Sequence, residues 1–282
     1  MRVALELIAN GYKLVEGPRT DAHGTLWFSD IFGGTVHRRT VDGELTTVVT
    51  DRTYVGGIAP HADGGVVMSG RSVVHWRDGS FRTLLEQPDN PHFNDLHTDA
   101  AGRVYVGAVR GQIKDVRQPP EPMGEAYRIE VDGSITELYG DVGISNGIGF
   151  SPDGRTLYHA DSSSCGIWVH DIDTHGNVSN RRHIGASAFS TGIPDGLCVD
   201  VDGNLWVAHY LGGRVVKLSP DGTELDELAV PAERVTSCAF GGSDWADLYV
   251  VSADNTDDAE LRGCVWRCRP GVTGVPTPLA RV

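Results

Sequence analysis

The chain has 282 residues, with 24 basic and 38 acidic side chains, and its formal net charge is −14. This charge excludes a nucleic-acid partner, which would need clustered Lys and Arg, but it is compatible with a cation site. No run of 18 apolar residues occurs, and segment 1–7 lacks the apolar core of a signal peptide, so we expect no membrane partner.

The five cysteines favour a reduced, cytoplasmic protein. Their number is odd and none belongs to a close CxxC pair. Cys198 and Cys238 lie in apolar strand contexts, which is typical of buried thiols. Cys264 and Cys268 are four residues apart, and a zinc site made from them alone would lack two ligands.

One sequence motif recurs along the chain. In each copy, an acidic or small residue and a turn residue precede a short alternating apolar run. The turn residues are Gly24, Gly64, Gly102, Gly154, Gly203 and, in a degenerate copy, Ala246. Subtraction gives spacings of 40, 38, 52, 49 and 43 residues. This period is typical of propeller blades. The sequence therefore predicts an all-β, six-bladed β-propeller of four-stranded antiparallel blades, forming one domain over 1–282, with almost no helix.

Each blade is predicted to consist of strands A and B around the recurring turn, followed by a C–D hairpin. Asp-Gly pairs mark four of these hairpins, because both turn positions need positive φ; they lie at 42–43, 78–79, 132–133 and 221–222. Segment 4–8 is expected to pair with 263–266 and close the ring, although 277–281 competes for that role.

The antiparallel order places the start of A, the end of B and the start of C on one face of the ring, at the mouth of the central channel. Two long loops, 109–125 and 187–194, fall on this face. Loops of this length are often functional lids. The alternative is a surface insertion without function.

A carboxylate or an amide begins four of the six A strands. The six starting positions are Glu16, Gly57, Asn94, Asn146, Asp195 and Ser237. Glu16, Asn146 and Asp195 offer only oxygen ligands, which predicts a hard-cation site for Ca²⁺ first, then Mg²⁺, Mn²⁺ or a tolerated Zn²⁺. Each residue alone could be an ordinary turn residue. Asp195 differs from the other two Pro-Asp-Gly aspartates because it opens a strand instead of closing one.

The ends of the B strands supply further candidates at the mouth, namely Asp30, Arg71, Arg110, Asp161, His209 and Tyr210. His209 is expected to overhang the site near Asp195; the alternative is a structural histidine at a strand end. The chain contains no HExxH and no phosphate-cradling glycine loop, so nucleotide chemistry is unsupported.

The sequence resembles the gluconolactonase, regucalcin and luciferin-regenerating family of six-bladed propellers over nearly its full length. The matching segments are 16–18, 26–31, 94–95, 99–103, 146–154 and 194–196. The resemblance implies that Glu16, Asn146 and Asp195 bind one divalent cation, and that Asp195 is the catalytic general base. It also implies that Asn94 lies at the metal or contacts substrate.

The sequence departs from the sugar lactonases of that family at two positions. His92 and Leu96 stand where those members usually carry arginine and glycine around the Asn-Asp pair. Histidine cannot reproduce the forked hydrogen bonds of arginine to a polyol. A less polar lactone or ester is therefore expected as substrate.

We therefore expect a metal-dependent hydrolase that opens a lactone or similar cyclic ester, with a small molecule as its partner. The expected substrate contacts are Asn94, His92, Asp95, His209 and Arg71. One alternative is another enzyme on the same scaffold, such as a phosphoester hydrolase or a lyase or isomerase of a carbonyl compound, because fold does not fix function. Another is a metal-containing protein that binds a small molecule unchanged.

Overall fold

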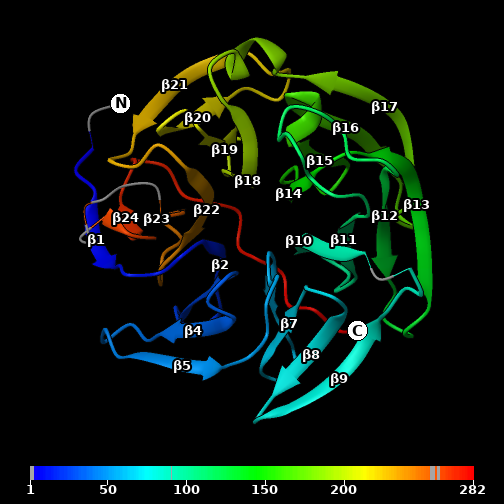
Figure 1. The fold of residues 1–282 in the computed structure, drawn as a ribbon, viewed down its shortest axis with the longest axis horizontal. Coiled ribbons are helices and arrows are strands. Elements are labelled where there is room, and N and C mark those ends of the chain that lie inside the picture. The colour runs from blue at the N-terminus through cyan, green and yellow to red at the C-terminus, as the bar shows by residue number, and fades with distance from the viewer. Residues whose placement is uncertain (1–2, 90, 255–257, 259–260) are drawn as a thin grey trace.

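The computed structural model describes residues 3–89, 91–254, 258 and 261–282. Six four-stranded antiparallel sheets are arranged around a central axis (Figure 1). Each sheet pairs its strands with their sequence neighbours, except that the last sheet takes in the N-terminal strand. The predicted six-bladed propeller is confirmed.

The first strand of each blade lines the channel and the fourth forms its outer edge. Blade 1 contains β2 (Val15–Thr20), β3 (Leu26–Asp30), β4 (Thr35–Arg39) and β5 (Leu45–Val49). Blade 2 contains β6 (Ile58–Pro60), β7 (Val66–Met68), β8 (Val73–Arg77) and β9 (Ser80–Leu85). Blade 3 contains β10 (His92–Thr98), β11 (Val104–Val109), β12 (Gly124–Ile129) and β13 (Ile135–Val142).

The second half of the chain repeats this arrangement. Blade 4 contains β14 (Ser145–Phe150), β15 (Thr156–Asp161), β16 (Gly166–Ile172) and β17 (Val178–Ile184). Blade 5 contains β18 (Ile193–Val199), β19 (Leu205–Tyr210), β20 (Arg214–Leu218) and β21 (Glu224–Ala229). Blade 6 contains β22 (Val235–Gly241), β23 (Asp247–Ser252), β24 (Val265–Cys268) and β1 (Glu6–Ala9).

The N-terminal strand closes the ring, as predicted. β1 pairs with β24, with Leu7 opposite Trp266, so an edge that would otherwise be open is covered. The C-terminal segment does not compete for this position. It crosses the middle of the ring (Figure 1), where Val275 N donates to Val199 O and Ala280 N donates to Pro60 O.

Helix is almost absent from the described part of the chain, as expected from the period-two pattern. The two helical segments are short 3₁₀ turns, η1 (Ser162–Ser164) and η2 (Ala186–Phe189). The hydrophobic core consists of clusters between neighbouring blades, because each sheet buries both faces against its neighbours. This packing holds the inner strands in fixed positions around the channel.

Candidate active site

A β-bulge interrupts five of the six inner strands at the channel mouth. The register shifts fall between Glu16 and Arg19, Phe93 and Leu96, Ser145 and Ile148, Pro194 and Leu197, and Val235 and Ser237. A bulge inserts an unpaired residue and re-aims the side chains next to it. The repeated bulges therefore coincide with the polar positions singled out in the sequence.

Glycine follows three of these polar residues because the inner strands approach one another closely. A Cβ on Gly147 would lie 2.3 Å from the Leu197 nitrogen of the next blade. Gly17 has φ +57°, a conformation that side-chain-bearing residues rarely adopt. The Glu-Gly, Asn-Gly and Asp-Gly pairs thus combine an inward polar side chain with tight contact between blades.

Three buried carboxylates and one buried guanidinium share the channel. Glu16, Asp95 and Asp195 are 6%, 3% and 7% exposed, and Arg19 is 2% exposed. Arg19 Nη2 lies 3.3 Å from Asp95 Oδ1. If all four groups are ionised, three negative charges against one positive leave two uncompensated.

Burial and mutual repulsion act on these carboxyl groups. Burial, then the charges of Asp195 and Asp95, raises the pKa of Glu16 well above its usual value. Burial, then Asp95, raises the pKa of Asp195 in the same direction. Burial also raises the pKa of Asp95, although Arg19 opposes this effect. Two strongly perturbed carboxyl groups in a cleft are typical of a functional site.

Asn146 is held with its amide oxygen toward Asn94. Asn146 Nδ2 donates to Ser162 Oγ at 2.7 Å, and the Ser162 hydroxyl donates to Pro194 O at 2.6 Å. Because the serine proton is committed to Pro194, the serine oxygen must accept from the amide nitrogen. Asn94 Nδ2 in turn donates to Asn146 Oδ1 at 2.7 Å and to Ser145 O at 2.7 Å.

These donors fit a hard divalent cation. Glu16 accepts one hydrogen bond, from Gly17 N at 3.2 Å, and the hydrogen bond found for Asp195 comes from the backbone of Gly196. Two buried carboxylates with so few partners, beside an amide oxygen, provide the oxygen ligands that Ca²⁺ prefers. Within the described ranges, no group of three His, Cys, Asp or Glu side chains could hold a metal, so a cation here would also need Asn146.

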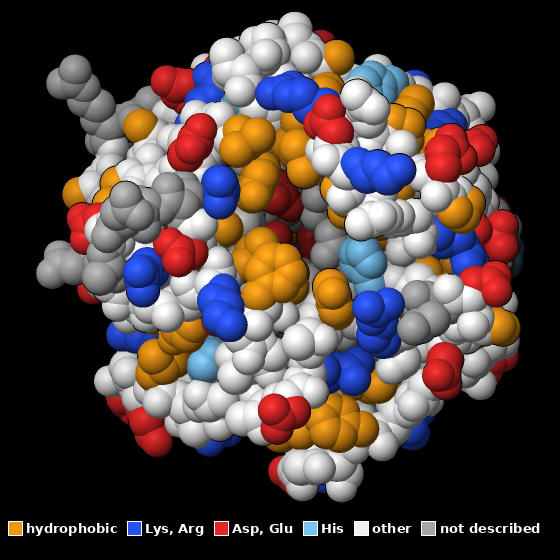
Figure 2. All heavy atoms as spheres, in the orientation of Figure 1, with side chains coloured by type: hydrophobic (Ala, Val, Ile, Leu, Met, Phe, Trp, Pro, Cys, Tyr) orange, Lys and Arg blue, Asp and Glu red, His pale blue; other side chains and the backbone are white. Residues whose placement is uncertain are grey.

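The rim of the mouth carries aromatic and basic side chains. The Tyr54 and His92 ring centroids are 5.5 Å apart, and Arg71 Cζ lies 4.8 Å from the Tyr54 centroid. Burial, then the charge of Arg71, lowers the pKa of His92 to about 4. Figure 2 shows acidic side chains at the bottom of the central hollow, with hydrophobic and basic ones around it.

Two carboxylates predicted at the mouth hold loops instead. Asp30 accepts from the backbone nitrogens of Lys13 and Leu14, at 3.0 and 3.1 Å. Asp161 accepts from Gly143 N and Ile144 N, each at 3.0 Å. Both aspartates end a B strand and fix the segment that leads into the inner strand of their own blade. Their equivalent positions in the repeat explain why the sequence pattern placed them together.

His209 does not overhang the site. Its side chain is 0% exposed, so the expected contact with a ligand is not possible in this structure. Nδ1 accepts from Arg214 Nε at 2.9 Å, and the ring packs edge-on against Phe189 at 5.3 Å. Burial lowers the pKa of His209 to about 4. The structural alternative for this histidine is therefore the correct one, because the second long loop folds over it through η2.

Leu96 also departs from expectation. It is 0% exposed and belongs to a core cluster with Val67 and Val106, so its side chain does not contribute to the less polar substrate preference expected from this departure. The bulge turns Leu96 toward the core and leaves the preceding Asn94 and Asp95 near the channel. Asp95 is engaged by Arg19 and by its own neighbour Leu96 N, the latter at 2.8 Å.

Sequence reasoning missed two residues of the site. Arg19 was hidden because the bulge breaks the simple alternation of strand β2. Ser162 lies in η1, where a serine run looks like an ordinary turn. Tyr210, a predicted candidate at the mouth, does lie near the buried carboxylates, because burial and then the charge of Asp195 raise its pKa.

The first long loop, between β11 and β12, is mostly exposed to solvent. Arg110 at its start pairs with Glu125 at its end, the Nε–Oε2 distance being 2.7 Å. Arg117 Nη1 lies 3.9 Å from Cys165 Sγ, so the loop extends to blade 4. This position is compatible with the predicted lid.

The fold and the site together define a six-bladed propeller with an acidic oxygen-donor site at one end of its channel. A family model described as SMP-30/Gluconolactonase/LRE-like region matches residues 14–254. The chain belongs to this family.

Several known proteins are similar to the chain over most of their length. Regucalcin of Xenopus laevis is 35% identical over 277 residues, which cover 95% of this chain and 91% of regucalcin. Pentonolactonase XacC of Haloferax volcanii is 32% identical, with coverage of 94% and 93%. The structure of a luciferin-regenerating enzyme superposes with a TM-score of 0.89 at 28% identity and covers 100% of both chains.

Among the described residues, no helix is long and apolar enough to cross a membrane. All five cysteines are free thiols. Cys198 Sγ and Cys238 Sγ are 3.8 Å apart on neighbouring inner strands.

Proposed function

We propose that this protein is a divalent-metal-dependent hydrolase that opens a lactone or similar cyclic ester. The observation that carries the proposal is the pair of uncompensated buried carboxylates, Glu16 and Asp195, beside the oriented amide of Asn146. Similarity to the pentonolactonase XacC supports lactone hydrolysis, as does 33% identity over 268 residues to the 6-deoxy-6-sulfogluconolactonase of Pseudomonas putida.

Glu16, Asn146 and Asp195 would hold the cation, and their oxygen-only chemistry favours Ca²⁺ over Mg²⁺, Mn²⁺ or Zn²⁺. A divalent cation bound there supplies polarisation of the ester carbonyl and stabilisation of the developing oxyanion. This chemistry matches the needs of ester hydrolysis, in which negative charge develops on one oxygen.

The side chains would supply the base and the orientation. The carboxylate of Asp195 would accept the proton of the attacking water as general base. Asn94, His92 and Arg71 orient the substrate from the blade 2 and blade 3 side of the mouth. Asp95 serves as the counter-ion of Arg19.

A lactone panel tests the proposal. Proton release in weak buffer would be followed for alkyl, aromatic and sugar lactones, with chelator and then with added Ca²⁺, Mn²⁺ or Zn²⁺. We expect turnover that chelator abolishes and one cation restores. Cation binding without turnover of any lactone would favour a small-molecule binding protein, and turnover that is unaffected by chelator would reject metal dependence.

The free thiols also bear on location. Five unpaired cysteines suit a reducing compartment, so we infer that the protein works in the cytoplasm.

A further inference from the structure

The opposite end of the channel contains a second cavity, of about 740 Å³. It is lined by the far ends of the inner strands β10, β14, β18 and β22 and by the C-terminal segment 275–278, here called the strap. The proposed hydrolase site uses the near ends of the same strands. The cavity is therefore built from the same ring but belongs to its other face.

The Arg19–Asp95 ion pair lies between the two ends of the channel. Arg19 lines the cavity, while Asp95 acts on the pKa values of Glu16 and Asp195 at the mouth. Along β10, His97 follows Asn94 by three residues, which is roughly 10 Å of strand. A molecule in the cavity would therefore lie beyond reach of the proposed metal ligands.

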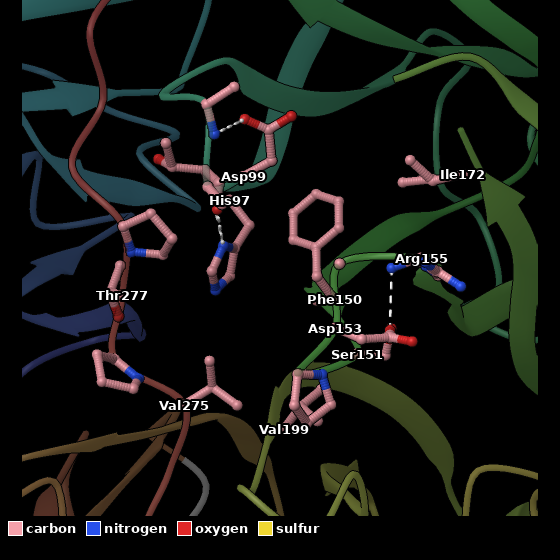
Figure 3. A pocket seen from close by; sticks show the side chains of 18 of the residues that line it. His97, Asp99, Phe150, Ser151, Asp153, Arg155, Ile172, Val199, Val275 and Thr277 are labelled. Carbon is pink, nitrogen blue, oxygen red and sulfur yellow. Dashed lines mark hydrogen bonds between the residues drawn. The ribbon is translucent and has the colours of Figure 1, made fainter. Parts of the chain in front are cut away.

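His97 provides a hydrogen-bond donor directed into the cavity (Figure 3). Its Nδ1 lies 2.8 Å from Thr98 N, which can only donate, and 3.0 Å from Thr98 O, which can only accept. We assign the shorter contact as the hydrogen bond, so that Nδ1 accepts and the ring proton of the neutral imidazole is on Nε2. No hydrogen bond from the described residues reaches that nitrogen.

Further unused polar atoms lie at the inner end of the cavity. Arg19 Nε and Thr98 Oγ1 have no hydrogen-bond partner among the described residues, although the two residues are only 2% and 0% exposed. Buried polar atoms of this kind are usually satisfied. Both residues line the cavity together with His97, although these two atoms are themselves covered by protein.

The remaining walls are largely apolar. Phe150, Val199, Phe240, Val275 and Pro278 all line the cavity. Phe150 packs edge-on against the His97 ring, with the ring centroids 5.6 Å apart. Figure 3 shows Val275 of the strap below the two rings. An apolar pocket with a few polar groups at one end is the usual form of a small-molecule site.

The acidic residues around the cavity are already paired. Asp99 Oδ2 lies 2.6 Å from Arg103 Nε, and Asp153 Oδ1 accepts from Arg155 N at 3.1 Å. Arg19 is neutralised by Asp95. The three arginines and three aspartates that line the cavity balance in number, so the lining carries no net charge and its chemistry suits a neutral ligand.

We propose that this cavity is a second binding site, for a neutral, mainly apolar small molecule that bears one carbonyl oxygen. The carbonyl accepts from His97 Nε2, while the rest of the molecule packs between Phe150 and the strap. This site is separate from the proposed hydrolase site and does not depend on a metal.

Benzophenone is a suitable probe because it is a neutral aromatic ketone and forms covalent crosslinks on irradiation. Diphenylmethane is the matched ligand that lacks the carbonyl. Calorimetric titration of both compounds would be combined with crosslinking and peptide mass spectrometry on the full chain. We expect saturable benzophenone binding, unchanged by chelator, with crosslinks in 149–155 and 275–278.

Two variants test the assignment. Val275→Trp should fill the cavity and weaken benzophenone binding at least tenfold, while lactone turnover stays unchanged. His97→Phe keeps the ring but removes the donor, so it should abolish the preference for benzophenone over diphenylmethane, which we expect to be about tenfold. Asp195→Asn should leave benzophenone binding intact, which separates this site from the proposed hydrolase site.

Three results would overturn the proposal. These are the absence of saturable benzophenone binding up to its solubility limit, crosslinks confined to the rim around Tyr54 and His92, and equal affinity of the wild type and Val275→Trp. A correctly folded His97→Phe protein that retained the full carbonyl preference would reject the role of His97.

Discussion

The Ser162 hydroxyl fixes the amide orientation of Asn146 by accepting from its Nδ2 at 2.7 Å. Because the same hydroxyl donates to Pro194 O, it also ties η1 to the strand that carries Asp195. One serine thus links two of the three proposed cation ligands. The link connects blade 4 to blade 5, so the site depends on how neighbouring blades pack.

Ser162→Ala should therefore weaken cation binding without removing any ligand. Loss of a group that orients a ligand typically lowers metal affinity by about 10–100-fold. The measurement is the Ca²⁺ concentration needed to raise the melting temperature. Ser162→Thr should retain binding, and Ser164→Ala, which changes the same 3₁₀ turn, should match the wild type. Unchanged Ca²⁺ affinity in Ser162→Ala would reject the orienting role.

Asp195→Asn should abolish lactone turnover while the fold remains intact. The amide cannot act as a base, and it removes one of the two uncompensated negative charges. Glu16→Gln should mainly weaken cation binding. Since a ligand that binds only the folded state stabilises it, Ca²⁺ should raise the melting temperature of the wild type more than that of Glu16→Gln. Near wild-type rates in Asp195→Asn would contradict the mechanism.

Arg19→Met should destabilise the protein by about 3–5 kcal/mol, because it leaves Asp95 buried and unpaired. The double change with Asp95→Asn should recover part of this loss, as a double-mutant cycle in urea would measure. Arg77→Met is the matched control, since the Arg77–Asp78 pair is exposed and should contribute about 1 kcal/mol or less. Additive effects of the two channel substitutions would argue against coupling.

Mild acid should destabilise the fold through His159. This ring is 0% exposed and lies 2.8 Å from both Tyr139 Oη and Ser145 Oγ; burial lowers its pKa to about 4. The unfolded chain therefore binds a proton more readily between pH 4 and 6.5. The contribution to stability is complete above 6.5 and falls by about 1.4 kcal/mol per pH unit down to 4.

The slope of unfolding free energy against pH tests this expectation. His159→Gln should reduce the slope between pH 6.5 and 4 by the share of one histidine, because His92 and His209 also have a pKa lowered to about 4. The same change at the exposed His175 should leave the slope as in the wild type. An identical slope in His159→Gln and the wild type would show that another group controls acid stability.

His92→Arg should shift specificity toward sugar lactones. Arginine restores a forked donor at the rim, and recognition of a polyol depends on such donors. We expect kcat/KM for gluconolactone to rise about tenfold relative to an alkyl lactone. Leu96→Gly should destabilise the core without changing preference, because Leu96 lies away from the mouth. A wild type that prefers gluconolactone over every unsubstituted lactone would contradict the assignment.

The sequence by itself determined the ring. The sequence predicted six four-stranded blades from six copies of one turn motif and from the alternating apolar runs. This was possible because strand periodicity and Gly-containing turns are local properties. The same repeat placed Glu16, Asn146 and Asp195 at equivalent positions. The order of strands within each blade was therefore enough to predict that these three proposed ligands lie at the same end of the channel. The closing strand β1 also followed from pattern, since a ring leaves one edge to cover.

Only the tertiary structure decided what these positions contact. The bulges turned Leu96 into the core, and Arg19 proved to pair with Asp95, because a one-residue slip reverses which face a side chain occupies. η2 buried His209, and the C-terminal strap crossed the far end of the channel. Such contacts join residues that are distant in sequence, and packing between blades, which no local pattern encodes, determines them.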